Sequence, residues 1–105
     1  MVTQQAAIKM VEEFVSEVKS LGIYLKRVIL FGSVAANKQH EYSDIDVALV
    51  ADDFSGVGFI DMSRFVKALR KHYTIQPRTF ATHDFEQGDA FIEEILKTGI
   101  EIETS

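Results

Sequence analysis

Apolar residues recur at helical spacing near the start of the chain, at positions 8, 11, 14, 15, 18 and 21, and charged residues occupy the other side. This period is typical of an amphipathic α-helix with one face on a core. Thr3 stands where a helix N-cap is expected, and Gly22 stands where a left-handed residue often ends a helix. We therefore predict a helix between Thr3 and Gly22.

A run of β-branched, aliphatic and aromatic residues at 27–31 then predicts a buried strand. This run stops abruptly at Gly32-Ser33. The next residues, 34–36, predict a short helix, and Asn37 can take a left-handed conformation at its end. After a polar loop, residues 44–50 form a second strand-like run.

The second half of the chain repeats the alternation of helix and strand. A helical apolar face at 61–72 precedes a strand-like run at 73–80, which contains Pro77. Proline cannot donate to a β-ladder, so this strand is expected either to lie at a sheet edge or to end at Pro77. A last helix is expected around 91–96, and the pattern of 99–103 predicts a short terminal strand. We expect an α/β (α+β) fold with a small mixed sheet of about four strands and packed helices, in one domain spanning 1–105.

Composition narrows the possible functions. The net charge of −5, from 11 basic and 16 acidic residues, disfavours tight non-specific nucleic-acid binding, which depends on Lys and Arg. The chain has no cysteine, no secretory leader pattern and no apolar run near the ~20 residues that span a bilayer. A cytoplasmic protein without a membrane segment is the expectation.

Two carboxylates lie near the start of the second strand, at Asp44 and Asp46. Side chains two apart on a strand share a face, so these groups are expected roughly 6–7 Å apart along the chain. Ile45, Val47 and Leu49 would face the core. Adjacent carboxylates raise each other's pKa unless a cation lies between them, and Mg²⁺ commonly takes one or two carboxylates with water and phosphate oxygens.

The turn at Gly32-Ser33 supplies a complementary feature. A strand that stops at glycine lets a ligand approach the backbone, and a helix starting there presents unpaired N–H groups to an anion. The Ser33 hydroxyl adds a donor. The turn is suited to phosphate, and the aspartate pair is suited to the metal that accompanies phosphate.

Gly32-Ser33, together with Ser43-Asp44-Ile45-Asp46 beginning ten positions after Ser33, resembles the signature of the DNA polymerase β-like nucleotidyltransferase superfamily in its minimal form. Residues 75–80 and 94–102 also resemble the closing segment of such small domains.

The resemblance implies Mg²⁺-dependent transfer of a nucleoside monophosphate from a nucleoside triphosphate, with ATP the expected donor. Gly32, Ser33 and Ser43 would contact the nucleotide, and Asp44 and Asp46 would be catalytic metal ligands in a two-metal site. The third carboxylate of that site is expected on the strand at 73–80, where the matching residue is Gln76. Its amide can ligate a cation but cannot act as a base, so the metal site is incomplete.

Three functions are compatible with these residues. The first is a nucleotidyltransferase that modifies an acceptor hydroxyl, which a partner protein could carry. The second is a catalytically weakened nucleotide-binding or antitoxin-type module that binds a helical HEPN-type partner. The third is a homodimeric scaffold in which the acidic pair is only structural. The apolar residues Phe54, Val57 and Phe59 are candidates either for a partner contact or for covering the core.

Overall fold

The core of the fold is a four-stranded mixed sheet with the strand order β3-β2-β1-β4. The structure is a computed structural model that describes residues 3–38 and 44–104. Strand β1 (Arg27–Phe31) runs antiparallel to both β2 (Ile45–Ala51) and β4 (Ile100–Ile102), and β2 runs parallel to β3 (Ile75–Ala81). The expected mixed α/β fold with four strands is confirmed.

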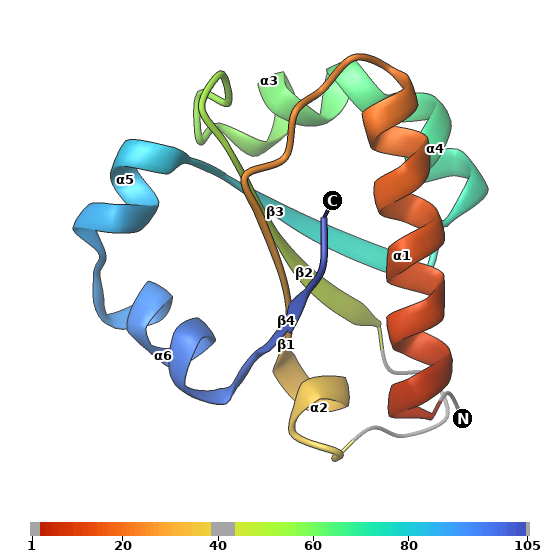
Figure 1. Cartoon of the computed structure of the whole chain (residues 1–105), viewed down its shortest axis with the longest axis vertical. Helices are drawn as coiled ribbons and strands as arrows, with labels where there is room; N and C mark the ends of the chain where they lie inside the picture. The colour runs from red at the N-terminus through yellow and green to blue at the C-terminus, as the bar shows by residue number, and fades with distance from the viewer. Residues whose placement is uncertain (1–2, 39–43, 105) are drawn as a thin grey trace.

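Helices cover both faces of this sheet. Figure 1 shows α1 and α4 on one side of the strands and α5 and α6 on the other, with α2 at the end of β1. The helices are α1 (Gln4–Ser20), α2 (Gly32–Ala35), α3 (Gly58–Met62), α4 (Val66–Lys71), α5 (Thr82–Gln87) and α6 (Ala90–Thr98), and a 3-10 turn, η1 (Ser63–Phe65), joins α3 to α4. In the described parts of the chain, no helix has the length and apolar character needed to cross a membrane.

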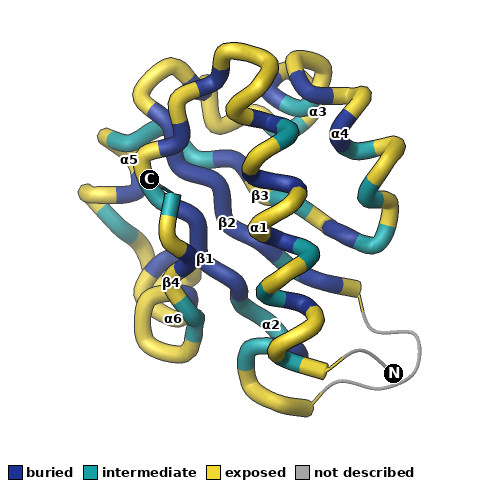
Figure 2. Tube along the Cα trace, turned by 45° about the vertical axis from the view of Figure 1, so that its right-hand side comes forward, coloured by how far each residue is buried: buried dark blue, intermediate teal, exposed yellow. Residues whose placement is uncertain are grey.

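The sheet separates two hydrophobic cores. The larger lies under α1 and includes Phe14, Phe65 and the β2 side chains of Ile45, Val47 and Leu49. The smaller lies under α5 and α6 and contains Ile29, Ala48, Val50, Phe85, Ile92 and Ile95. Figure 2 shows β1 and β2 as the buried centre of the molecule between more exposed helices. Alternate β2 residues thus supply both cores, because neighbouring side chains on a strand point to opposite faces.

Helix α1 forms for the reasons its sequence indicates. The Thr3 hydroxyl accepts a hydrogen bond from the Ala6 N–H at 3.1 Å and so caps the first turn. Gly22, with φ of 87°, takes the chain out of the helix in a conformation that costs a residue with a side chain about 1–2 kcal/mol. The residues it buries are Ala7, Val11, Phe14, Val15 and Val18.

Two helical regions differ from the sequence prediction. The helix predicted over 61–72 starts earlier and is split into α3, η1 and α4. Helix α5 was not predicted. Its only buried residue is Phe85, whose ring packs on Phe80 at 5.3 Å, so a tertiary contact and not a periodic pattern holds this helix in place. Strand β3 starts at Ile75 and lies at the sheet edge, which confirms the expectation from Pro77.

Asp61, on α3, is a buried carboxylate with a complete set of hydrogen-bond donors. Asp61 is only 1% exposed, whereas a carboxylate in the first turn of a helix is ordinarily exposed to solvent. Its carboxylate accepts hydrogen bonds from the N–H groups of Ser55 and Gly56 at 2.9 Å, the Ser55 hydroxyl at 3.0 Å and the Thr79 hydroxyl at 2.7 Å. Asp61 therefore ties the loop before α3 to strand β3.

We expect Asp61→Asn to lower the free energy of unfolding by about 2 kcal/mol or more. The amide NH₂ group of asparagine cannot accept hydrogen bonds, so some of the buried donors around residue 61 would lose their acceptor. Burial alone raises the pKa of Asp61, but the hydrogen bonds from Ser55, Thr79 and Gly56 outweigh it and hold that pKa below its ordinary value.

A carboxyl with a lowered folded pKa stabilises the fold above its unfolded pKa of about 3.9, and this contribution is lost as pH falls through the folded value. Urea unfolding at neutral and acidic pH should therefore show the cost of Asp61→Asn shrinking below about pH 4. Asp52→Asn, at an exposed carboxylate of the same loop, is the control. Equal effects of the two changes would contradict the assignment.

Candidate functional site

The predicted site residues come together where the C-terminal end of β1 meets the N-terminal ends of β2 and β3. Phe31 is the register partner of Asp46 in the antiparallel pair, and Asp46 is the register partner of Gln76 in the parallel pair. One row across the sheet therefore contains these three residues in the order Phe31, Asp46, Gln76. Gly32 follows Phe31 directly, so the Gly32-Ser33 turn lies next to the start of the acidic strand, as the family resemblance implied.

Gly32 lies against the carboxylate of Asp46. A Cβ built on Gly32 would lie 2.3 Å from the Asp46 Oδ2 atom, far inside van der Waals contact. Gly32 also has φ of 79°, in the left-handed region that side chains disfavour. Both constraints require glycine here, and they fix the start of α2 beside the carboxylate.

Helix α2 presents its first turn at this point. The first N–H groups of a helix have no acceptor within the helix. Phe31, which precedes α2, provides no side-chain cap for them. The half-buried Ser33 adds a hydroxyl at the same place. Asn37 closes the turn with φ of 58°, as expected. Ser43, the third predicted nucleotide contact, lies outside the described residues.

The two aspartates have different surroundings. Asp44 is exposed and precedes β2, whereas Asp46 is half-buried within it. The core-facing prediction for Ile45, Val47 and Leu49 is confirmed, since each is no more than 1% exposed. Burial, and then the charge of Asp44, raise the pKa of Asp46 above its ordinary value, while Arg78 acts in the opposite direction. A cation near this pair would relieve its electrostatic cost.

Gln76 lies on β3 beside Asp46 and is exposed. Among residues 3–38 and 44–104, no group of three or more His, Cys, Asp or Glu side chains is placed to hold a metal ion. The oxygen donors present are two carboxylates and an amide. This set fits one Mg²⁺, which typically binds one or two carboxylates and completes its shell with water and phosphate oxygens. It falls short of the carboxylate set implied for two ions.

Arg78 and Phe91 also belong to this region, and the sequence analysis overlooked both. Arg78 is two residues after Gln76 on β3, so it shares the face of Gln76. Its guanidinium carbon lies 4.8 Å from the centroid of the Phe91 ring at the start of α6. Strand alternation from Gln76 was the signal that could have identified Arg78. Phe91 carried no comparable signal, because its place depends on how α6 packs.

An apolar hollow of about 490 Å³ adjoins the turn between α2 and α6. It is lined by Phe31, Gly32, Ser33, Ala36, Lys38, Phe91, Glu94, Ile95 and Thr98. A ligand held at Gly32 and Ser33 would therefore have apolar surface next to it.

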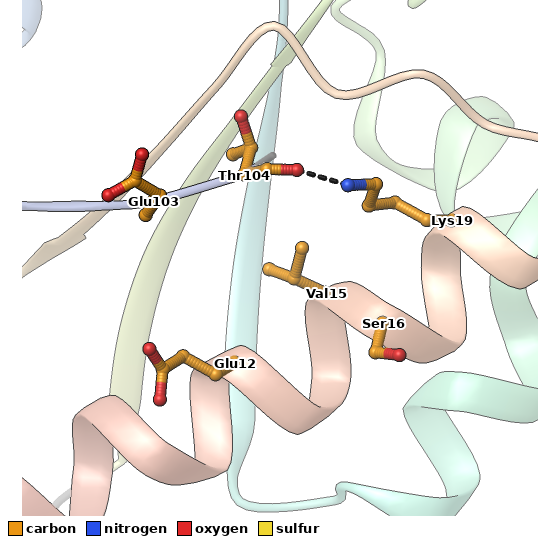
Figure 3. Close-up of a pocket in the computed structure, with 6 residues that line it drawn as sticks. All are labelled: Glu12, Val15, Ser16, Lys19, Glu103 and Thr104. Atoms are coloured by element: carbon orange, nitrogen blue, oxygen red, sulfur yellow. Dashed lines mark hydrogen bonds between the residues drawn. The ribbon is translucent and has the colours of Figure 1, made fainter.

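A second hollow, of about 510 Å³, lies on the opposite side of the sheet, between α1 and the end of the chain. Figure 3 shows it with Glu12 and Val15 on the helix and Lys19 Nζ donating a hydrogen bond to the Thr104 carbonyl. The Asp46 side chain faces away from α1, because its strand neighbours Ile45 and Val47 occupy that face. This hollow is separate from the candidate site.

We expect Gly32→Ala to destabilise the fold by more than Gly88→Ala. Both glycines have φ of 79°, but a Cβ at Gly88 would meet nothing within 4 Å, whereas at Gly32 it would meet Asp46. Gly88→Ala therefore measures a backbone cost without a steric clash, roughly 1–3 kcal/mol, because φ of 79° with ψ of 165° is a conformation adopted almost only by glycine. Chemical unfolding of both variants isolates the additional cost of displacing the carboxylate. Equal losses would contradict the close packing of Asp46.

We expect Asp46→Asn to raise the unfolding temperature of the ligand-free protein at neutral pH. A carboxyl with a raised folded pKa loses stability as pH rises from its unfolded pKa through its folded value, and asparagine avoids that loss. The gain should fade below about pH 4, where both states are protonated. Thermal unfolding across pH checks this. A neutral-pH loss of stability would show that the charged form is favoured in the fold.

Comparisons with known proteins agree with this fold. The family model described as polymerase beta, nucleotidyltransferase matches residues 12–105. A candidate nucleotidyltransferase from Sulfolobus solfataricus has a similar structure, with a TM-score of 0.67 and 22% identity over 93% of this chain and 80% of its own. A toxin–antitoxin structure with AMP-PNP gives a TM-score of 0.63 and 18% identity over 90% of this chain and 73% of its own.

Among curated proteins the comparison finds no match. At these identities the two solved structures establish the fold, while the family model covers most of the sequence. The chain belongs to the polymerase β nucleotidyltransferase family.

Proposed function

We propose that this protein binds a magnesium–nucleoside triphosphate, with ATP the expected nucleotide, and transfers its nucleoside monophosphate to an acceptor hydroxyl. The observation that carries the proposal is the packing of the Asp46 carboxylate against Gly32. It places an acidic group suited to a cation beside a turn suited to phosphate. A magnesium–triphosphate complex matches both halves of this site.

Each residue has a distinct task in this proposal. The N–H groups at Gly32 and Ser33 and the Ser33 hydroxyl donate hydrogen bonds to phosphate oxygens. Asp44 and Asp46 hold Mg²⁺, and Gln76 can add an amide oxygen. When bound, the ion would stabilise negative charge on the reacting phosphate oxygens.

The transfer step forms one bond and breaks one. The acceptor oxygen attacks the α-phosphorus, and the bond from that phosphorus to the oxygen bridging to the β-phosphate breaks, releasing pyrophosphate. Gln76 can orient the acceptor hydroxyl by accepting a hydrogen bond, but it cannot take its proton. The proton therefore leaves to solvent. Since general-base catalysis contributes about 10²–10⁴-fold, turnover should be slow.

We expect each of Asp44→Asn and Asp46→Asn to abolish Mg²⁺-dependent nucleotide binding, measured by calorimetric titration of each nucleoside triphosphate. Asp52→Asn is the matched control, since it removes an exposed carboxylate outside the site. The native protein and the control should bind with the same affinity. Binding that persists in Asp46→Asn would contradict the metal site, and no binding to the native protein would contradict the nucleotide site itself.

We expect Gln76→Glu to increase transfer from an α-labelled nucleoside triphosphate, because glutamate restores a base and a third negative charge beside Asp46. The readout is label attached to protein or to an added acceptor, with Asp46→Asn as the inactive control. Transfer by the native protein would establish the enzyme. If Gln76→Glu instead lowered the amount of transfer, residue 76 would not occupy the position of the third carboxylate.

A second function, an antitoxin-type module that binds a helical HEPN-type protein, is favoured by the neutral Gln76 in the acidic position. One structural neighbour is itself a toxin–antitoxin structure with AMP-PNP. Helix α3 and the residue before it also expose apolar side chains: Val57 is 40% exposed, Phe59 79% and Ile60 49%. An exposed apolar patch of this kind marks many protein–protein contacts.

Co-purification with a HEPN-type protein from the same organism tests this function. Phe59→Ser should weaken the complex while leaving nucleotide binding intact. The control is Tyr24→Ser, which removes an exposed aromatic residue outside α3. Complex formation without detectable transfer would favour the binding module, whereas transfer to the partner would favour the enzyme.

A further inference from the structure

Arg78 lies next to the candidate site on the strand that carries Gln76. Its register partner is Ala48, two residues after Asp46 on β2. Since side chains two apart on a strand share a face, Arg78, Gln76 and Asp46 all project from the side of the sheet that α5 and α6 cover. The Arg78 side chain is exposed, so a ligand at this end of the sheet can reach it.

The guanidinium of Arg78 is held on a platform of aromatic rings. It lies over Phe91 at 4.8 Å from the ring centroid, and Phe91 packs edge-on against Phe31 at 5.8 Å. Phe31 is the register partner of Asp46 and precedes Gly32. These ring contacts link Arg78, through Phe91, to Phe31, which lies beside both Gly32 and Asp46. A guanidinium placed over a ring face can still direct its in-plane N–H groups to an anion.

Two other arginines provide a contrast. Arg27 forms a two-bond ion pair with Glu101, and Arg64 pairs with Asp53 at 2.8 Å. Arg78 makes no ion pair with any residue in the described ranges, 3–38 and 44–104. Its donors are therefore not occupied by a carboxylate, although it is close enough to Asp46 to lower that residue's pKa.

The charges around the site differ from those of a site with three carboxylates. Asp44 and Asp46 contribute two negative charges, Gln76 contributes none, and Arg78 adds one positive charge. One divalent cation would make the summed charge of these groups positive, so that they would attract a negatively charged triphosphate. A second divalent cation would lie beside a fixed guanidinium and would be repelled.

We propose that Arg78 is a phosphate-binding residue, whose guanidinium supplies the positive charge that a second metal ion would otherwise provide. It would donate paired hydrogen bonds to non-bridging oxygens of the triphosphate while one Mg²⁺ is held by Asp44 and Asp46. This inference rests on the proposed nucleotide binding and adds a specific anion ligand and a metal count to it.

The first test is calorimetric titration of ATP with Mg²⁺ into native protein, Arg78→Ala and Arg78→Lys. We expect Arg78→Ala to weaken binding about tenfold or more, because hydrogen bonds between charged groups are among the stronger ones. Arg78→Lys should fall between, since lysine keeps the charge but loses the paired geometry. Arg64→Ala is the control, because Arg64 also lies over a ring, that of Phe54, at 5.8 Å but away from the site.

The outcomes distinguish a failure of the role proposed for Arg78 from a failure of the proposed nucleotide binding. Native binding that Arg78→Ala leaves unchanged would overturn the role of Arg78 and preserve the proposed function. No binding by the native protein would overturn both. Thermal unfolding of each variant identifies any loss of fold, and Arg78→Lys supplies the comparison if Arg78→Ala unfolds.

The second test counts metal ions by equilibrium dialysis with Mn²⁺ and saturating ATP. We expect one ion for each native protein–nucleotide complex. The double variant Gln76→Glu, Arg78→Ala restores a third carboxylate and removes the guanidinium, so it should take up a second ion. Two ions on the native complex would overturn the proposal, and so would one ion on a double variant that still binds ATP.

Discussion

The close approach of the Asp46 carboxylate to Gly32, which leaves no room for a Cβ, is the constraint on which the rest of the site depends. It exists because β1 and β2 are antiparallel neighbours, so the end of one and the beginning of the other form a single row with Phe31 opposite Asp46. Any side chain at Gly32 would displace the carboxylate, and its φ of 79° independently disfavours one. Sheet pairing therefore brings the Gly32-Ser33 turn next to Asp46.

This arrangement carries an electrostatic cost that the rest of the fold must offset. Asp46 is half-buried near a second carboxylate, and its raised pKa reports that the ligand-free protein disfavours its charge. The hydrophobic cores on both sides of β2 keep the strand in place despite that cost. Asp61 is the opposite case, because a full set of donors stabilises its buried charge. Asp46 is thus the carboxylate that a cation would relieve.

Much of this could be predicted from the sequence, and the exceptions have physical causes. The strand signals at 27–31 and 44–50 were clear because both runs are rich in β-branched and aliphatic residues, and the family resemblance implied that Gly32 and Asp46 belong to one site. Helix α5 was missed because its single buried residue, Phe85, creates no period.

The structural role of Asp61 was also not predicted. Its partner Thr79 lies 18 residues away in sequence, on another element, and only the folded chain brings the two side chains to 2.7 Å. Gln76 was expected beside the acidic pair, and the parallel register with Asp46 places it there. The roles of Ser43, Asp44, Asp46 and Gln76 in binding or catalysis stay predictions.

The most direct test of the central claim is a crystal structure of the protein with Mg²⁺ and a non-hydrolysable nucleoside triphosphate. The account predicts one ion bonded to the carboxylates of Asp44 and Asp46, with phosphate oxygens on Gly32 and Ser33 and on the guanidinium of Arg78. A nucleotide bound elsewhere, such as in the hollow between α1 and the end of the chain, would contradict it.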